Sequence, residues 1–119
     1  MKYLLLIYTV EADWAKNNPD PQKLMDGYWQ YTQDLTKDGH MIAGEGLDPT
    51  ATAKTVRVRG GQIQASDGPF AETKEQLGGF YLVEAKDLDE AIALAAEIPD
   101  AQNGSIEVRP VTAFDPPPA

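Results

Sequence analysis

The run from Tyr3 to Tyr8 constrains the fold of this chain more than any other stretch. All six of its residues are apolar or aromatic, and no charged or amide side chain alternates with them. Successive side chains of a strand point to opposite faces of a sheet, so this run predicts a central strand that is covered on both faces. Whatever fold the chain adopts must therefore cover two faces of one sheet.

Two amphipathic helices are predicted. Asp20 and Pro21 give the first helix an N-cap and a proline at its first position, and Asp87 caps the second, which Pro99 ends. Apolar residues follow each start at helical spacing. The first stripe comprises Leu24, Tyr28, Tyr31 and Leu35, and the second comprises Leu88, Ala91, Ile92, Ala95 and Ile98.

The remaining apolar segments predict strands, and Gly60-Gly61 predicts a tight hairpin turn. The order strand, helix, strand, hairpin, strand, helix, strand predicts an α+β fold, a ferredoxin-like βαβ repeat with an inserted β-hairpin. Right-handed crossovers place both helices on one sheet face. A partner sheet in a homodimer is the simplest cover for the other face. The expected further strands are 40–47, 54–59, 62–66, 80–85 and 105–111, with a short helical turn at 71–77.

Composition narrows the classes of function. The length of 119 residues fits one domain, and the net charge of −9 repels phosphate backbones and anionic lipid, so we expect no nucleic-acid or membrane partner. The absence of cysteine excludes disulfides, thiolate nucleophiles and cysteine-held metals. We expect no cofactor. The first apolar run is too short to span a membrane and lacks a signal-cleavage pattern, so we expect a cytoplasmic protein.

The densest group of informative residues is the turn that begins at Asp67. Gly68 and Pro69 restrict the backbone to a sharp turn, which would hold Phe70 in one direction among charged groups. One interpretation is a site that orients a small polar ligand; the other is an ordinary turn capped by its own carboxylate, with Phe70 in the core. The candidate ligand-binding residues are Glu45, Arg57, Gly68, Pro69, Phe70, Glu72 and Lys74.

Two residues are candidates for catalysis. Asp67, or His40 paired with a carboxylate, would act as general acid or base on a small organic acid or ring compound. The alternative for His40 is an exposed residue at a helix end. Glycines flank Glu45, which leaves its carboxylate with little steric cover. Asp67, Glu45 and Glu72 offer oxygen ligands to a hard cation, but no motif fixes their spacing and we expect no metal site.

Six segments together carry a family resemblance: Met1–Tyr8, Ala43–Leu47, Thr55–Arg59, Asp67–Tyr81, Asp87–Ala91 and Glu107–Pro110. They resemble the YCII-related family and, within it, the branch with a D-G-P-F signature. From length and the closing proline run we expect one domain over residues 1–112 and a proline-rich tail at 113–119. The resemblance implies a homodimeric, ferredoxin-like α/β barrel.

The same resemblance implies two kinds of function. One is small-ligand binding or a signalling-accessory role beside an extracytoplasmic-function sigma factor, which would then be a partner. The other is an undetermined enzyme activity, since distant relatives carry a His-Asp pair in a pocket.

Overall fold

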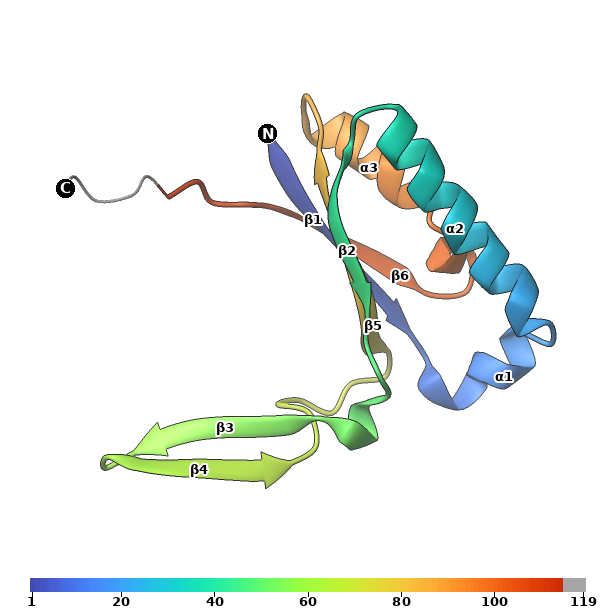
Figure 1. Cartoon of the computed structure of the whole chain (residues 1–119). Coiled ribbons are helices and arrows are strands. Elements are labelled where there is room, and N and C mark those ends of the chain that lie inside the picture. Colours follow the sequence, from blue (N-terminus) through green and yellow to red (C-terminus); the bar gives the residue numbers. More distant parts are fainter. Residues whose placement is uncertain (115–119) are drawn as a thin grey trace.

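A four-stranded antiparallel sheet organises the chain, in the strand order β2-β5-β1-β6 (Figure 1). The computed structural model describes residues 1–114. The sheet comprises β1 (Lys2–Thr9), β2 (Met41–Gly46), β5 (Gln76–Glu84) and β6 (Ser105–Pro110). Its order and crossovers give an α+β arrangement that is compatible with a ferredoxin-like fold.

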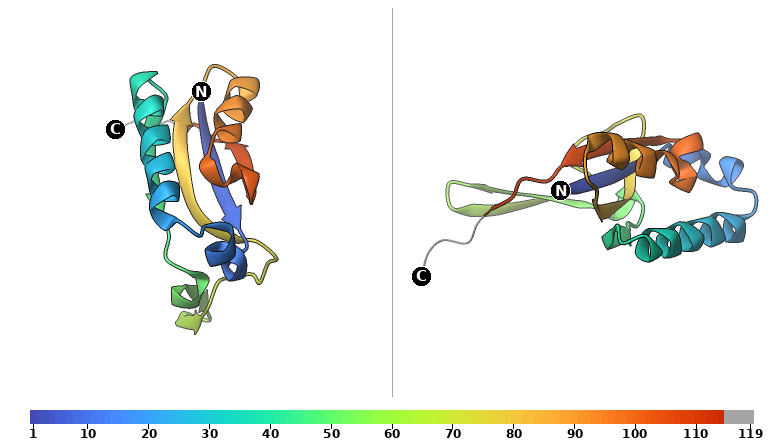
Figure 2. Two further views of the ribbon diagram at one scale, coloured as in Figure 1. Left: turned by 90° about the vertical axis from the view of Figure 1, so that its right-hand side faces the viewer. Right: turned by 90° about the horizontal axis from the view of Figure 1, so that it is seen from above.

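Both long helices, α2 (Pro21–Lys37) and α3 (Leu88–Ala96), cover the same face of this sheet (Figures 1 and 2). The predicted helix starts are confirmed: the Asp20 side chain accepts a hydrogen bond from Lys23 N, and the Asp87 side chain accepts one from Glu90 N. Shorter helical elements lie in the connections between the strands and helices. These are η1 (Glu11–Asp13), α1 (Trp14–Asn17), η2 (Thr50–Thr52) and η3 (Pro99–Gln102).

The core lies between the sheet and the two helices. On β1, Tyr3, Leu5 and Ile7 face the helices and are buried, whereas the side chains between them are only half-buried on the other face. We call that second face, which no helix covers, the open face. Its half-buried apolar residues include Leu4, Leu6, Tyr8, Phe80 and Leu82.

Strand β5 begins earlier than the sequence predicts. The helical turn expected at 71–77 is wrong, because β5 begins at Gln76 and pairs from there with Thr9 of β1. Two glycines, Gly78 and Gly79, lie inside the strand. A Cβ on Gly79 would lie 2.9 Å from the Glu45 backbone oxygen, so close packing of β2 against β5 requires glycine there.

Strands β3 (Lys54–Arg59) and β4 (Gln62–Asp67) form a separate two-stranded hairpin. Gly60 and Gly61 at its tip both have positive φ, at 56° and 76°. The hairpin projects beyond the sheet on the side away from the helices (Figure 1). The radius of gyration is accordingly 16.7 Å, against roughly 13.5 Å for a compact chain of this length.

The segment after β6 leaves the sheet on the same side as the hairpin (Figure 1). Most of the proline-rich tail expected at 113–119 lies outside the described residues, which end at 114. Within those residues, no helix is long and apolar enough to cross a membrane.

Candidate functional site: a cleft between helix α2 and the sheet

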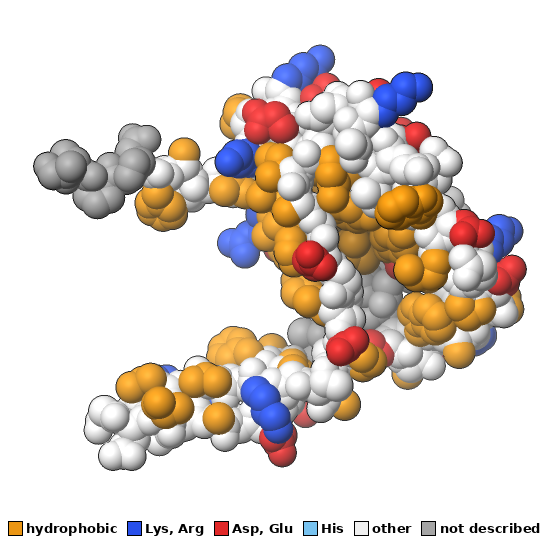
Figure 3. Space-filling view, in the orientation of Figure 1, with side chains coloured by type: hydrophobic (Ala, Val, Ile, Leu, Met, Phe, Trp, Pro, Cys, Tyr) orange, Lys and Arg blue, Asp and Glu red, His pale blue; other side chains and the backbone are white. Residues whose placement is uncertain are grey.

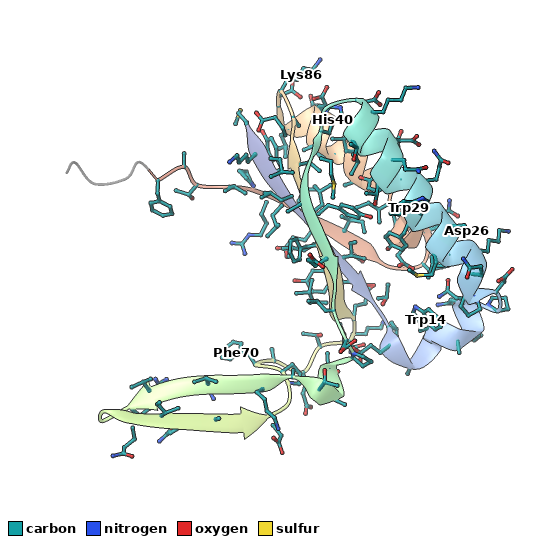
Figure 4. All side chains as sticks on the ribbon, viewed as in Figure 1. Trp14, Asp26, Trp29, His40, Phe70 and Lys86 are labelled. Carbon is teal, nitrogen blue, oxygen red and sulfur yellow. The ribbon has the colours of Figure 1, made fainter. Side chains whose placement is uncertain are left out.

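A cleft of about 700 Å³ opens between the N-terminal half of α2 and the sheet. Its volume lies within the range of small-molecule sites, roughly 300–1,000 Å³. Trp14 of α1 stands at the end of the cleft near the start of α2 (Figure 4). The other residues that line the cleft are Ile7, Thr9, Glu11, Leu24, Met25, Tyr28, Thr32, Met41, Gly44, Glu45, Gly46, Leu47, Pro49, Gly78, Gly79, Phe80, Tyr81 and Asp100.

Glycines on two neighbouring strands line the floor of the cleft and add no side chain to it. These are Gly44 and Gly46 on β2 and Gly78 and Gly79 on β5. Gly44 lies opposite Tyr81 in the sheet, and a Cβ on Gly44 would lie 2.8 Å from Cδ1 of that tyrosine ring. Gly46, two residues later on the same face, has nothing within 4 Å of the position of a Cβ. The two glycines that flank Glu45 therefore leave space above the sheet. Gly44 leaves room for the Tyr81 ring, and Gly46 leaves room for the cleft.

The wall of the cleft holds a short hydrogen bond between two distant residues. The hydroxyl of Tyr28 on α2 donates to Oδ2 of Asp100 on η3 at 2.5 Å. Asp100 is only 7% exposed, so its carboxylate is removed from most water. A hydrogen bond of this length to a carboxylate is typical of the stronger, charge-assisted kind.

A second pair of hydroxyls continues this polar wall. Thr32 Oγ1 lies 2.9 Å from both the backbone oxygen of Tyr28 and the hydroxyl of Tyr81. Because the backbone oxygen can only accept, Thr32 donates its proton there, and Tyr81 donates to Thr32. The rings of Tyr28 and Tyr81 are stacked with centroids 6.5 Å apart, and Tyr31 meets Tyr81 edge-on at 5.1 Å.

Burial raises the pKa of the tyrosines around the cleft. Desolvation is the largest cause for Tyr28, and the hydrogen bond to the Asp100 carboxylate raises its pKa further. Desolvation also raises the pKa of Tyr31 and of Tyr81. These hydroxyls therefore keep their protons at neutral pH and act as hydrogen-bond donors.

Glu11 fixes the loop at the mouth of the cleft. Its carboxylate accepts hydrogen bonds from the backbone nitrogen and the hydroxyl of Thr50, both at 2.8 Å. Its own backbone nitrogen donates to Oε1 of Gln76 at 2.9 Å. Glu11 thus joins η1 to η2 and β5, and its charge lies beside the cleft.

The structure places the Asp67 turn on the hairpin, away from this cleft. Asp67 is exposed and its carboxylate pairs with the ammonium of Lys54. Gly68 has a φ of 96°, which gives the sharp turn the sequence predicts, and Phe70 is 81% exposed rather than in the core. The guanidinium of Arg57 lies 5.6 Å from the centre of the Phe70 ring. Also on this segment, and also exposed, are Pro69, Glu72 and Lys74.

Of the other two sequence candidates, Glu45 is among the residues that line the cleft, whereas His40 lies away from it. His40 sits at the far end of α2 from Trp14 (Figure 4), where Nδ1 donates to the Glu84 backbone oxygen at 2.7 Å and lies 3.9 Å from Glu90 Oε1. Glu45 is exposed and pairs with Phe80, so alternation directs its side chain to the open face. Within residues 1–114, His40, Glu45 and Asp67 do not come together, and no cluster of three metal-binding side chains forms.

The sequence alone does not indicate the Tyr28–Asp100 pair. Tyr28 belongs to the apolar stripe of the first predicted helix, and no local pattern singles out Asp100. One signal was available, because Tyr28 and Tyr31 on the apolar stripe of the first helix each need a hydrogen-bond partner for a hydroxyl once the stripe is buried. Tyr31 meets that need with the backbone oxygen of Leu94, at 2.7 Å.

The fold and the cleft define a small α+β domain with a helix–sheet pocket. The chain belongs to the YCII-related family, whose domain it matches over residues 1–115. An uncharacterized protein of Rhizobium meliloti (strain 1021) is 36% identical to it over 121 residues, covering 98% of this chain and 96% of the relative.

A solved structure shares the fold at low sequence identity. It is the 5-chloro-2-hydroxyhydroquinone dehydrochlorinase of Burkholderia phenoliruptrix AC1100 in complex with 2,5-dihydroxybenzoquinone. The match has a TM-score of 0.54 and 14% identity and covers 96% of each chain.

Proposed function

We propose that this protein binds a small ring compound in the cleft between α2 and the sheet. The observation that carries this proposal is the combination of an open, glycine-floored cleft with aromatic walls and one hydrogen-bonded pair, half-buried Tyr28 and buried Asp100. Mostly apolar lining with a few fixed polar groups is typical of small-molecule sites. A related fold that holds a six-membered ring compound supports the same class of ligand.

Calorimetric titration with hydroquinone, a neutral dihydroxylated ring, tests this proposal. Gly46→Leu should weaken binding at least tenfold, because the new side chain would fill open space in the cleft. Its Cβ would have no atom of the described residues within 4 Å. Gln33→Leu is the matched control, since it adds the same side chain at an exposed position of α2 that does not line the cleft. Unchanged binding in a folded Gly46→Leu variant would place the ligand elsewhere and reject the proposal.

A second candidate function is a proton-transfer enzyme on a hydroxylated ring. The specific observation in its favour is that Tyr28 and Asp100 place a hydroxyl and a carboxylate together on the wall of the cleft. A carboxylate of this kind is a candidate general base. Asp67 and the His40–carboxylate pair, the earlier candidates for this role, stay predictions.

Chloride release from 5-chloro-2-hydroxyhydroquinone, the compound named for the related dehydrochlorinase, tests this second function. We expect Asp100→Asn to lower the release rate at least a hundredfold if the cleft is the active site. Asp67→Asn and His40→Gln, tested in parallel, should leave the rate unchanged. A wild-type protein that releases no chloride above background would reject this activity.

We further propose that the protein is a homodimer joined through the open face, as in a dimeric α/β barrel. Large apolar side chains are exposed on the hairpin and after β6, and both segments extend on the side of the open face (Figures 1 and 3). An isolated two-stranded hairpin is marginal in water, which favours contact with a partner. These exposed residues are Val56, Val58, Ile63, Phe70, Val111 and Phe114.

Charge also favours a second copy as the occupant of the open face. The hairpin carries three basic side chains, Lys54, Arg57 and Arg59, against one acidic side chain, whereas the whole chain has a net charge of −9. The hairpin of one copy would therefore be attracted to the body of another. The sigma-factor partner stays a prediction, for which co-purification with the factor is the test.

A further inference from the structure

We propose that the cleft selects ligands that carry a protonated amine, and that Asp100 is the residue that recognises it. This inference rests on the proposed small-molecule function of the cleft and specifies the charge of the ligand. It begins from the described residues that line the cleft, which include acidic side chains but no lysine, arginine or histidine.

The carboxylate of Asp100 has an unfilled place for a donor. Within residues 1–114, Tyr28 is the only side chain that donates to it, and it does so at Oδ2. No side-chain nitrogen or oxygen of the described residues is both fully buried and unpaired, so Oδ1 retains some access, and the cleft lies beside it. A carboxylate can accept several hydrogen bonds, so Oδ1 is free to accept one from a ligand.

The same carboxylate also lacks a counter-charge. Within the described residues, the ion pairs join Glu84 to the N-terminus, Glu90 to His40 and Asp67 to Lys54, and none includes Asp100. A buried charge without an opposite charge is costly. An ammonium group in the cleft would supply both the opposite charge and the missing donor.

The aromatic lining suits a cation as well. Trp14, Tyr28 and Tyr81 line the cleft, and the negative face of an aromatic ring attracts an organic cation within about 6 Å. Tyr81 and Tyr28 are stacked, so they present a continuous aromatic wall. A ring compound with an amine would use the wall for its ring and its charge together.

An anionic ligand meets the opposite conditions. The Glu11 carboxylate, held by Thr50, lies at the cleft together with Asp100, and no basic lining residue offsets the two. Like charges in a partly desolvated site repel, and the negative net charge of the chain adds to that field. The small organic acid considered from the sequence is therefore the disfavoured class.

Three probes with the same ring test the inference by calorimetric titration: phenethylamine, 2-phenylethanol and phenylacetate. They are positively charged, neutral and negatively charged at pH 7. The wild-type protein should bind the amine at least tenfold more tightly than the alcohol, and phenylacetate more weakly than the alcohol. Asp100→Asn should reduce the amine-to-alcohol affinity ratio to about one. Asp34→Asn, which removes a carboxylate from α2 at an exposed position outside the cleft lining, should leave the ratio unchanged.

The wild-type comparison is decisive even if the Asp100→Asn variant does not fold. Equal affinities for the amine and the alcohol, or tighter binding of phenylacetate, would overturn the charge inference while the cleft still binds a ring. Failure of all three probes to bind at millimolar concentration would overturn both this inference and the proposed ring-binding function. An amine preference that survives in a folded Asp100→Asn variant would reject Asp100 as the recognising residue.

Discussion

The hydroxyl of Tyr28 donates a hydrogen bond to the carboxylate of Asp100 at 2.5 Å, across 72 positions of the chain. The contact joins α2 to η3 and forms one wall of the cleft. The contact anchors the N-terminal half of α2 to η3, at the place where the cleft separates this part of the helix from the sheet. The same pair therefore serves the stability of the fold and the chemistry proposed for the site.

Tyr28→Phe should lower the free energy of unfolding by about 1.5–3 kcal/mol, because the buried Asp100 carboxylate loses its donor. Tyr31→Phe is the matched control on the same helix, since it removes a hydroxyl that donates to an uncharged backbone oxygen. Its expected loss is about 0.5–1.5 kcal/mol. Urea denaturation measures both values, and a smaller loss for Tyr28→Phe than for Tyr31→Phe would contradict the prediction.

Stability should fall as the pH rises above about 10. The folded-state pKa of Tyr28 and of Tyr31 lies above the unfolded value near 10, so the folded state holds protons that the unfolded state has lost. The resulting stabilisation is complete below pH 10 and is lost above it. Each tyrosine contributes a slope of up to about 1.4 kcal/mol per pH unit.

Urea denaturation at pH 9, 10 and 11 checks this pH dependence. Tyr28→Phe removes one of the tyrosine contributions, so the variant should lose less stability than the wild type between pH 10 and pH 11. The difference should reach at most about 1.4 kcal/mol. Identical pH slopes for the two proteins would show that Tyr28 titrates with an ordinary pKa.

Two alanine substitutions on β2 should have different effects on the stability of the fold. Gly44→Ala places a Cβ 2.8 Å from the Tyr81 ring and should destabilise the fold by about 1–3 kcal/mol. Gly46→Ala meets no atom within 4 Å and reduces the freedom of the unfolded chain, so it should be neutral or stabilise by up to about 1 kcal/mol. Thermal unfolding of the pair measures the contrast, and equal effects would refute the assigned role of Gly44.

Leu82→Lys should separate the proposed homodimer. Leu82 is half-buried in the middle of the open face, and a lysine there would bring a charge into the sheet–sheet interface. Light scattering should give the wild type a mass of about twice 13.0 kDa and the variant the mass of one chain. Gln33→Lys, on an exposed part of α2, controls for the added charge. A monomeric wild type would rule out the dimer.

The sequence determined the features that depend on neighbouring residues. Asp20 and Asp87 cap the two helices because a cap needs only a side chain and a backbone nitrogen a few residues later. Side chains along a strand alternate between its two faces, which is also a local rule. It puts three buried residues on one face of β1, namely Tyr3, Leu5 and Ile7. The shared segments from Met1–Tyr8 to Glu107–Pro110 also sufficed to place the chain in the YCII-related family.

Only the tertiary structure decided which distant residues meet. The start of β5 at Gln76 depends on pairing with Thr9, which outweighs the low strand preference of Gly78 and Gly79. Asp67 lies on a hairpin and Asp100 on the wall of a cleft, although each stands next to a turn-forming residue, Gly68 or Pro99, in the sequence. Periodicity reports which face a side chain takes, whereas a site requires the packing of segments that periodicity does not relate.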